Sequence, residues 1–188
     1  MVRSEREQLS STVEIDETLI GGVEHSGKRG RGTDKAIVVI AVESKELRGF
    51  GRIRMQHIPD ASGEALIPFI CDAVKSGANV QTDGWAGYNQ LQQENYLHQQ
   101  VILSAQSDPA HVSMPGVHRV ASLLKRWILG THQGSVRAEH LQSYLEEFTF
   151  RFNRRTSRSR GLVFRRLLEQ SVTTEPVIGA EIAHGYDW

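Results

Sequence analysis

The stretch Thr12-Val-Glu-Ile-Asp-Glu-Thr-Leu-Ile20 is the first predicted strand, and the other predicted elements are placed relative to it. Apolar side chains alternate loosely with polar ones along it, which predicts a strand that the following Gly-Gly pair closes. Asp16 lies in the middle of this strand, although aspartate is depleted in strand interiors. It is therefore either a solvent-facing acid on a half-exposed strand or a residue with a chemical role.

Two more strands are predicted downstream. Ala36–Val42 is a continuous apolar run rich in β-branched residues, which favours a buried strand. Gly49–Ile58 alternates again and predicts a third strand. The polar, glycine-containing segment 24–34 is typical of a hairpin connection, so the three strands are expected to form an antiparallel meander.

Helices and strands then alternate. Ser62 is placed to cap a helix, and a short strand over 79–82 stops at Asp83. A short helix is predicted over Tyr88–Glu94 and a fifth strand over Gln99–Leu103. Apolar side chains at helical spacing predict three later helices, Val117–Leu129, Ala138–Asn153 and Leu162–Val172.

This order is α/β. It is the RNase H-like arrangement: a five-stranded mixed sheet of order 3-2-1-4-5, flanking helices and a helical C-terminal part. We expect one domain over residues 12–172, with tails at 1–11 and 173–188.

The predicted strand order brings two carboxylates together. Asp83 precedes Gly84, and Asp-Gly is a common turn pair, so by itself it is explained as a turn residue. In a sheet of order 3-2-1-4-5, however, strands one and four are neighbours, and Asp16 and Asp83 approach each other. Two carboxylates that close need a counter-ion, and a hard divalent cation with oxygen ligands fits.

A third ligand is expected from the helix after the fifth strand. His118 lies in its first turn, just after Pro115 and Gly116, although it can equally be a surface histidine. The alternatives are His111, Glu139, Glu146 and Glu147, of which Glu139 stays open.

Composition excludes several classes of protein. The single cysteine, Cys71, allows no intrachain disulfide and no cysteine zinc cluster. The sequence contains no apolar run of about 18 residues and no signal-like N-terminus. These features suit the cytoplasm.

The net charge is zero, but positive charge is clustered, and the local field decides phosphate binding. Residues 151–166 hold seven arginines and no acid. The residues expected to contact DNA are Lys28, Arg29, Arg31, Trp85, Arg119, Lys125, Arg126, Arg151, Arg154 and Arg155. The alternatives are a solvated arginine segment and a loop at 28–31, and a Trp85 that packs in the core instead of stacking on a base.

Several long motifs resemble one known family. They cover roughly residues 13–172 and fall at 14–22, 28–35, 82–88, 117–127, 130–134 and 140–155. The stretches Thr82-Asp-Gly-Trp-Ala-Gly-Tyr88 and Val117-His-Arg-Val-Ala-Ser-Leu-Leu-Lys-Arg-Trp127 are typical examples. Together they resemble the ISXO-like insertion-sequence transposase domain, of the DDE superfamily of RNase H-like proteins.

The resemblance implies a catalytic domain for DNA transposition with a metal triad whose third member varies among Glu, Asn and His. The glutamate of the Asn-x-x-Glu variant falls at Ala121, which cannot bind metal, and the matching asparagine position is His118. We therefore expect the triad Asp16, Asp83 and His118, holding two divalent ions, Mg²⁺ or Mn²⁺.

The expected reaction is cleavage of double-stranded DNA at the ends of the element, followed by strand transfer into target DNA. Two divalent ions suit such an in-line displacement, and Asp16 is expected to contact both. A homodimer is expected because two ends must be joined. Relatives carry an N-terminal recognition region that is not visible before Thr12, so we expect a fragment, a truncated reading frame or recognition by another chain. The rival functions are another RNase H-like nuclease, such as a resolvase, and a DNA-binding remnant without activity.

Overall fold

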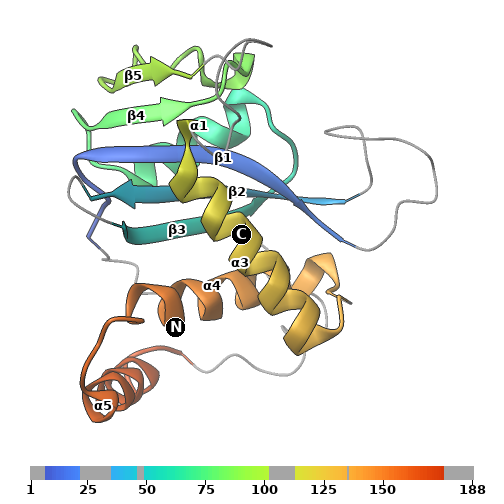
Figure 1. Cartoon of the computed structure of the whole chain (residues 1–188), viewed down its shortest axis with the longest axis vertical. Helices are drawn as coiled ribbons and strands as arrows, with labels where there is room; N and C mark the ends of the chain where they lie inside the picture. The colour runs from blue at the N-terminus through green and yellow to red at the C-terminus, as the bar shows by residue number, and fades with distance from the viewer. Residues whose placement is uncertain (1–6, 22–34, 46–48, 102–112, 135, 176–188) are drawn as a thin grey trace. The chain divides into compact units, whose positions relative to one another are not determined.

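A computed structural model describes residues 7–21, 35–45, 49–101, 113–134 and 136–175 (Figure 1). The chain divides into two compact units. One comprises Gln8–Ser135, and the other comprises Met1–Glu7 together with Val136–Trp188.

The first unit is built on a five-stranded sheet of order β3-β2-β1-β4-β5, as predicted. β1 pairs antiparallel with β2 and parallel with β4, so it lies at the centre of the sheet. The remaining pairs are β2 with β3, antiparallel, and β4 with β5, parallel. The strands are β1 (Thr12–Ile20), β2 (Ala36–Ser44), β3 (Phe50–Ile58), β4 (Asn79–Thr82) and β5 (Leu97–Gln100).

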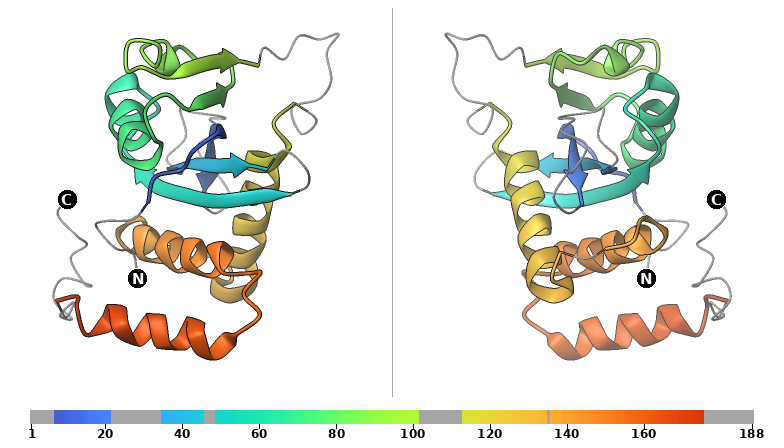
Figure 2. Two further views of the ribbon diagram at one scale, coloured as in Figure 1. Left: turned by 90° about the vertical axis from the view of Figure 1, so that its left-hand side faces the viewer. Right: turned by 90° about the vertical axis from the view of Figure 1, so that its right-hand side faces the viewer.

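Helices cover both faces of this sheet (Figure 2). Successive side chains of a strand point to opposite faces, and β2 is buried on both of them. One face of β2 joins the core cluster that contains the apolar side of α1 (Gly63–Ala73). The other face lies towards α3 (Pro115–His132), whose buried side chains are spaced for a single stripe: Val117, Val120, Leu124 and Ile128.

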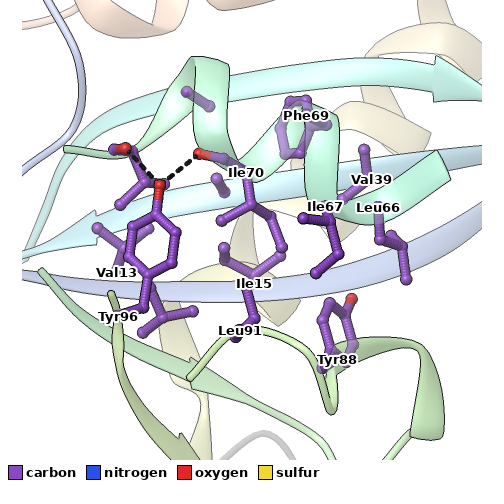
Figure 3. Packing of buried hydrophobic residues seen from close by; sticks show 14 of the residues in the cluster. Val13, Ile15, Val39, Leu66, Ile67, Phe69, Ile70, Tyr88, Leu91 and Tyr96 are labelled. Carbon is purple, nitrogen blue, oxygen red and sulfur yellow. Dashed lines mark hydrogen bonds between the residues drawn. The ribbon is translucent and has the colours of Figure 1, made fainter. Parts of the chain in front are cut away.

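The core on the α1 side is fixed by polar anchors as well as by apolar packing (Figure 3). The Tyr96 hydroxyl donates to the carbonyl oxygens of Val74 at 2.9 Å and Ile70 at 3.4 Å. Ser62 caps α1 as predicted, since its side chain accepts the Ala65 N–H at 3.3 Å. The two Tyr96 bonds hold the end of α1 next to the residue that precedes β5, and the Ser62 cap fixes the start of α1.

Two local predictions are corrected. The helix expected over Tyr88–Glu94 is a 3-10 turn, η2 (Ala86–Tyr88), followed by further turns. Both Tyr88 and Leu91 are fully buried, and bonds between residues three apart hold them there. The fifth strand begins earlier than expected, at Leu97, because its parallel pairing with β4 starts there, opposite Asn79.

Residue 9 also differs from the expected tail over 1–11. The Leu9 side chain is fully buried, and its backbone bonds to Ala73 and Lys75 at the end of α1. The apolar side chain therefore extends the core beyond the first strand.

The second unit contains α4 (Ala138–Asn153) and α5 (Arg160–Ser171), close to the predicted bounds. The predicted apolar stripe of α4 is buried, and it consists of Leu141, Leu145, Phe148 and Phe152. No helix in the described ranges combines the length and apolar character that crossing a membrane requires.

Candidate active site

Asp16 and Asp83 lie on neighbouring strands. In the parallel pairing of β1 with β4, Glu14 lies opposite Gln81. Continuing this register by two residues places Asp83, the first residue after β4, beside Asp16. The parallel pairing thus joins two acids that are far apart in the sequence.

The charges around Tyr88 agree with this placement. Burial raises the pKa of the Tyr88 hydroxyl well above its usual value, and the negative charges of Glu17, Asp16 and Asp83 raise it further. Both aspartates therefore lie within electrostatic reach of one buried hydroxyl group. Asp16 itself is half-buried, and its Oδ1 accepts the Glu17 N–H at 2.8 Å.

The loop after Asp83 is held at three points. Asp83 Oδ1 accepts the Trp85 N–H at 3.0 Å. The Trp85 indole N–H donates to the Ala61 carbonyl oxygen at 2.7 Å. Tyr88 donates its hydroxyl to Glu17 Oε1 at 2.7 Å. Trp85 is 37% exposed, so part of the residue is accessible although its indole N–H is already bonded.

The first turn of α3 lies against β1. Glu14 Oε2 accepts the Val117 N–H at 2.9 Å, and Glu14 is only 4% exposed. Glu14 and Asp16 are two residues apart on a strand and so share a face of the sheet. His118, half-buried, is the residue after Val117. Its helical turn therefore starts beside the segment of β1 that carries Asp16.

Sequence reasoning missed the role of Glu14. The spacing of two between Glu14 and Asp16 places both side chains on one face of the strand. What the sequence alone lacked was the partner, a backbone N–H more than a hundred residues away.

Further along α3, Lys125 is also within reach of Asp16. Burial lowers the pKa of Lys125, the positive charge of Lys35 lowers it further, and the negative charge of Asp16 acts in the opposite direction. Arg119 and Arg126 are exposed on the same helix. One helix thus carries three of the predicted DNA-contacting cations.

The predicted cations of the second unit are engaged with their own helix. Arg151 pairs with Glu147 at 2.7 Å. The guanidinium groups of Arg154 and Arg155 each lie 3.9 Å from the centre of a phenylalanine ring, Phe150 and Phe152 respectively. The third predicted cluster, Lys28, Arg29 and Arg31, lies outside the described residues.

The fit of a metal ion to these residues is partial. In the ranges that the structure describes, no group of three or more His, Cys, Asp or Glu side chains is arranged to hold a metal ion. The adjoining carboxylates of Asp16 and Asp83 do match the oxygen ligands that hard divalent cations take. His118 as the third ligand stays a prediction. Of its rivals, Glu139 is exposed in the first turn of α4, and His111 lies outside the described residues.

Comparisons with known proteins support the fold and show the family. The catalytic core domain of BIV integrase, in crystal form I, superposes with a TM-score of 0.52 at 16% sequence identity. The match covers 87% of this chain and 97% of that one, and it shows an RNase H-like fold. No curated protein matches the chain. The family model of the ISXO2-like transposase domain matches residues 8–153. The chain therefore belongs to the ISXO2-like transposase domain family.

Proposed function

We propose that residues 12–172 form the catalytic domain of a transposase that cleaves DNA at the ends of an insertion sequence and joins them to target DNA. The observation that carries this proposal is the parallel β1–β4 register. Extended by two residues, it brings Asp16 beside Asp83 in a sheet whose fold resembles that of an integrase catalytic core. Membership of a transposase family supports the choice of substrate and reaction.

In this reaction, water breaks a phosphodiester bond at the end of the element and leaves a 3′-hydroxyl group. That hydroxyl group then attacks a phosphodiester bond of target DNA, forms a new bond and displaces a 3′-hydroxyl group of the target strand. No covalent bond between protein and DNA is needed.

Asp16 would hold both divalent ions, Asp83 one of them and His118 the other. Bound Mg²⁺ or Mn²⁺ would activate the attacking oxygen and neutralise the charge that develops on the phosphoryl group. Lys125, on the helix that passes Asp16, would hold a DNA phosphate close to the site. The exposed cations of α3 would bind the phosphate backbone of the DNA, and such contacts give affinity but little sequence preference.

The first experiment uses the full chain and a short duplex that ends in the terminal repeat of its own element. Cleavage and strand transfer are measured in Mg²⁺ and in Mn²⁺ for the parent and for Asp16→Asn, Asp83→Asn and His118→Ala. Asp72→Asn, on the exposed side of α1, is the matched control. We expect activity to vanish in the three site variants and to persist in the control.

Other outcomes separate the rival explanations. If, of the three site variants, only His118→Ala keeps activity, the third ligand is another residue, and Glu139 is tested next. Cleavage without strand transfer from a pre-cleaved end indicates a nuclease of another RNase H-like class. Metal-independent DNA binding without cleavage indicates a remnant that binds DNA only.

The choice of metal tests His118 separately. An imidazole ligand suits Mn²⁺ better than Mg²⁺, so Mn²⁺ is expected to support the higher rate. Equal or lower rates in Mn²⁺ count against His118 as a ligand. We further propose that the domain acts in the cytoplasm as a dimer on paired DNA ends, which cross-linking in the presence of the duplex would detect.

A further inference from the structure

The acids on either side of Asp16 point to opposite faces of the sheet. Glu14 shares the face of Asp16, and Glu17 lies on the other face, because side chains alternate along a strand. Three acids so close together suggest extra metal ligands. The contacts of Glu14 and Glu17 indicate a different role.

Glu14 is hydrogen-bonded to the start of α3. Its Oε2 accepts the Val117 N–H at 2.9 Å, and its Oε1 accepts the Ser44 hydroxyl at 3.1 Å. The first N–H groups of a helix have no partner inside the helix, and Met114, the capping residue of α3, gives no side-chain bond. A carboxylate is favoured at this end by the helix dipole as well. Glu14 therefore caps, from β1, the turn that carries His118.

The close approach of the two elements depends on Gly116. A Cβ atom at this position would lie 2.8 Å from Glu14 Oε2. The absence of a side chain thus lets the helix start directly on the carboxylate.

Glu17 is committed to the loop that begins at Asp83. It accepts the Tyr88 hydroxyl at 2.7 Å, and Tyr88 lies fully buried in the core beside Leu66 (Figure 3). Tyr88 closes the η2 turn, five residues after Asp83. The bond therefore ties the loop of the second acid to the strand of the first.

We propose that Glu14 and Glu17 are positioning residues that fix the other two members of the site relative to Asp16. Glu14 fixes the turn of His118, and Glu17 fixes the loop of Asp83 through Tyr88. This inference rests on the proposed function, because it takes Asp16, Asp83 and His118 as the metal-binding set.

The test measures Mn²⁺ binding to the full chain by calorimetry, without DNA, together with kcat and KM for cleavage. Tyr88→Phe removes one hydroxyl group and leaves every carboxylate in place. We expect the Mn²⁺ dissociation constant to rise about tenfold or more in Tyr88→Phe and in Glu14→Gln, as for partners that orient metal ligands. KM for the duplex should change little, and kcat should fall.

Matched controls separate positioning from simple loss of stability. Tyr96→Phe also removes a buried hydroxyl group of the same core, but that group bonds the carbonyl oxygens of Ile70 and Val74, at the end of α1. Glu43→Gln is the control for Glu14→Gln, because Glu43 lies on β2 and bonds Arg52. Both controls should leave Mn²⁺ binding unchanged.

A double variant tests the bond itself. If Glu17 acts through Tyr88, Glu17→Gln with Tyr88→Phe binds Mn²⁺ no more weakly than Glu17→Gln alone, because coupled residues are not additive. Equal losses in Tyr88→Phe and Tyr96→Phe overturn the proposal, as do unchanged dissociation constants in Glu14→Gln and Tyr88→Phe when Asp16→Asn abolishes binding. Unchanged binding in Asp16→Asn refutes the proposed site itself, and the positioning roles with it.

Discussion

Replacing Gly116 by alanine should destabilise the first unit, although alanine is the better helix former. Gly116 is buried in the first turn of α3. An added Cβ atom would lie 2.8 Å from Glu14 Oε2 and 3.1 Å from Glu14 Cδ. The carboxylate cannot move away without breaking a hydrogen bond, because its two oxygens are bonded to Val117 and Ser44.

The size of the effect follows from two opposing terms. Alanine in place of glycine favours a helix by roughly 0.5–1 kcal/mol. Relief of the overlap requires the Glu14 carboxylate to leave the Val117 N–H, and a hydrogen bond to a charged group contributes about 1.5–3 kcal/mol. The net loss is then about 1–2 kcal/mol, which for a chain of this size lowers Tm by roughly 2–8 °C.

The assay is thermal and urea unfolding followed by circular dichroism. Gly130→Ala is the matched control on the same helix, since no atom lies within 4 Å of a Cβ built there. That variant should be stabilised by about 0.5–1 kcal/mol. A Gly116→Ala protein as stable as Gly130→Ala would refute the close approach of α3 to Glu14.

Two further predictions concern other parts of the first unit. Burial alone would raise the pKa of Glu43, but hydrogen bonds and the charge of Arg52 lower it from 4.5 to about 2. The ionised carboxylate therefore stabilises the fold above about pH 4.5, and this contribution disappears as the pH falls towards 2. Glu43→Gln should lower the free energy of unfolding by on the order of 1 kcal/mol at neutral pH after solvent screening. Urea unfolding should show the difference between parent and variant disappearing between pH 5 and pH 2. A difference that does not change with pH contradicts the ion pair. Gly87→Ala should lower the free energy of unfolding by about 1–3 kcal/mol. The added Cβ atom would lie 2.8 Å from the Ala61 carbonyl oxygen and 2.9 Å from the Trp85 indole nitrogen. Tryptophan fluorescence should shift at the same time, and an unshifted spectrum would mean that the indole keeps its bond.

The sheet could be predicted from sequence because its strands carry strong local patterns. The apolar run of β2 and the alternation of β1 fixed their type, and their bounds agree closely with the structure. The segment 88–94 was mispredicted because Tyr88 and Leu91 are apolar at helical spacing. In the structure this spacing serves a chain of turns, which a local pattern cannot distinguish from a short helix.

The candidate site could be predicted only in part, for a related reason. The pairing of Asp16 with Asp83 follows from the strand order, which sequence patterns indicate. The bonds from Glu14 to Val117 and from Tyr88 to Glu17 join residues separated by 103 and 71 positions. The pattern of residues within one helix or strand does not predict a contact with a distant element, so these roles could be assigned only from the three-dimensional structure.

The way in which α3 is held bears on the proposed role of His118. Glu14 accepts a backbone N–H group, that of Val117. The direction of this helical turn is then set independently of which side chain follows. We therefore expect the turn to keep its direction when the side chain at position 118 is replaced, as in His118→Ala. The constraint falls instead on position 116, because a Cβ atom there would lie 2.8 Å from Glu14 Oε2.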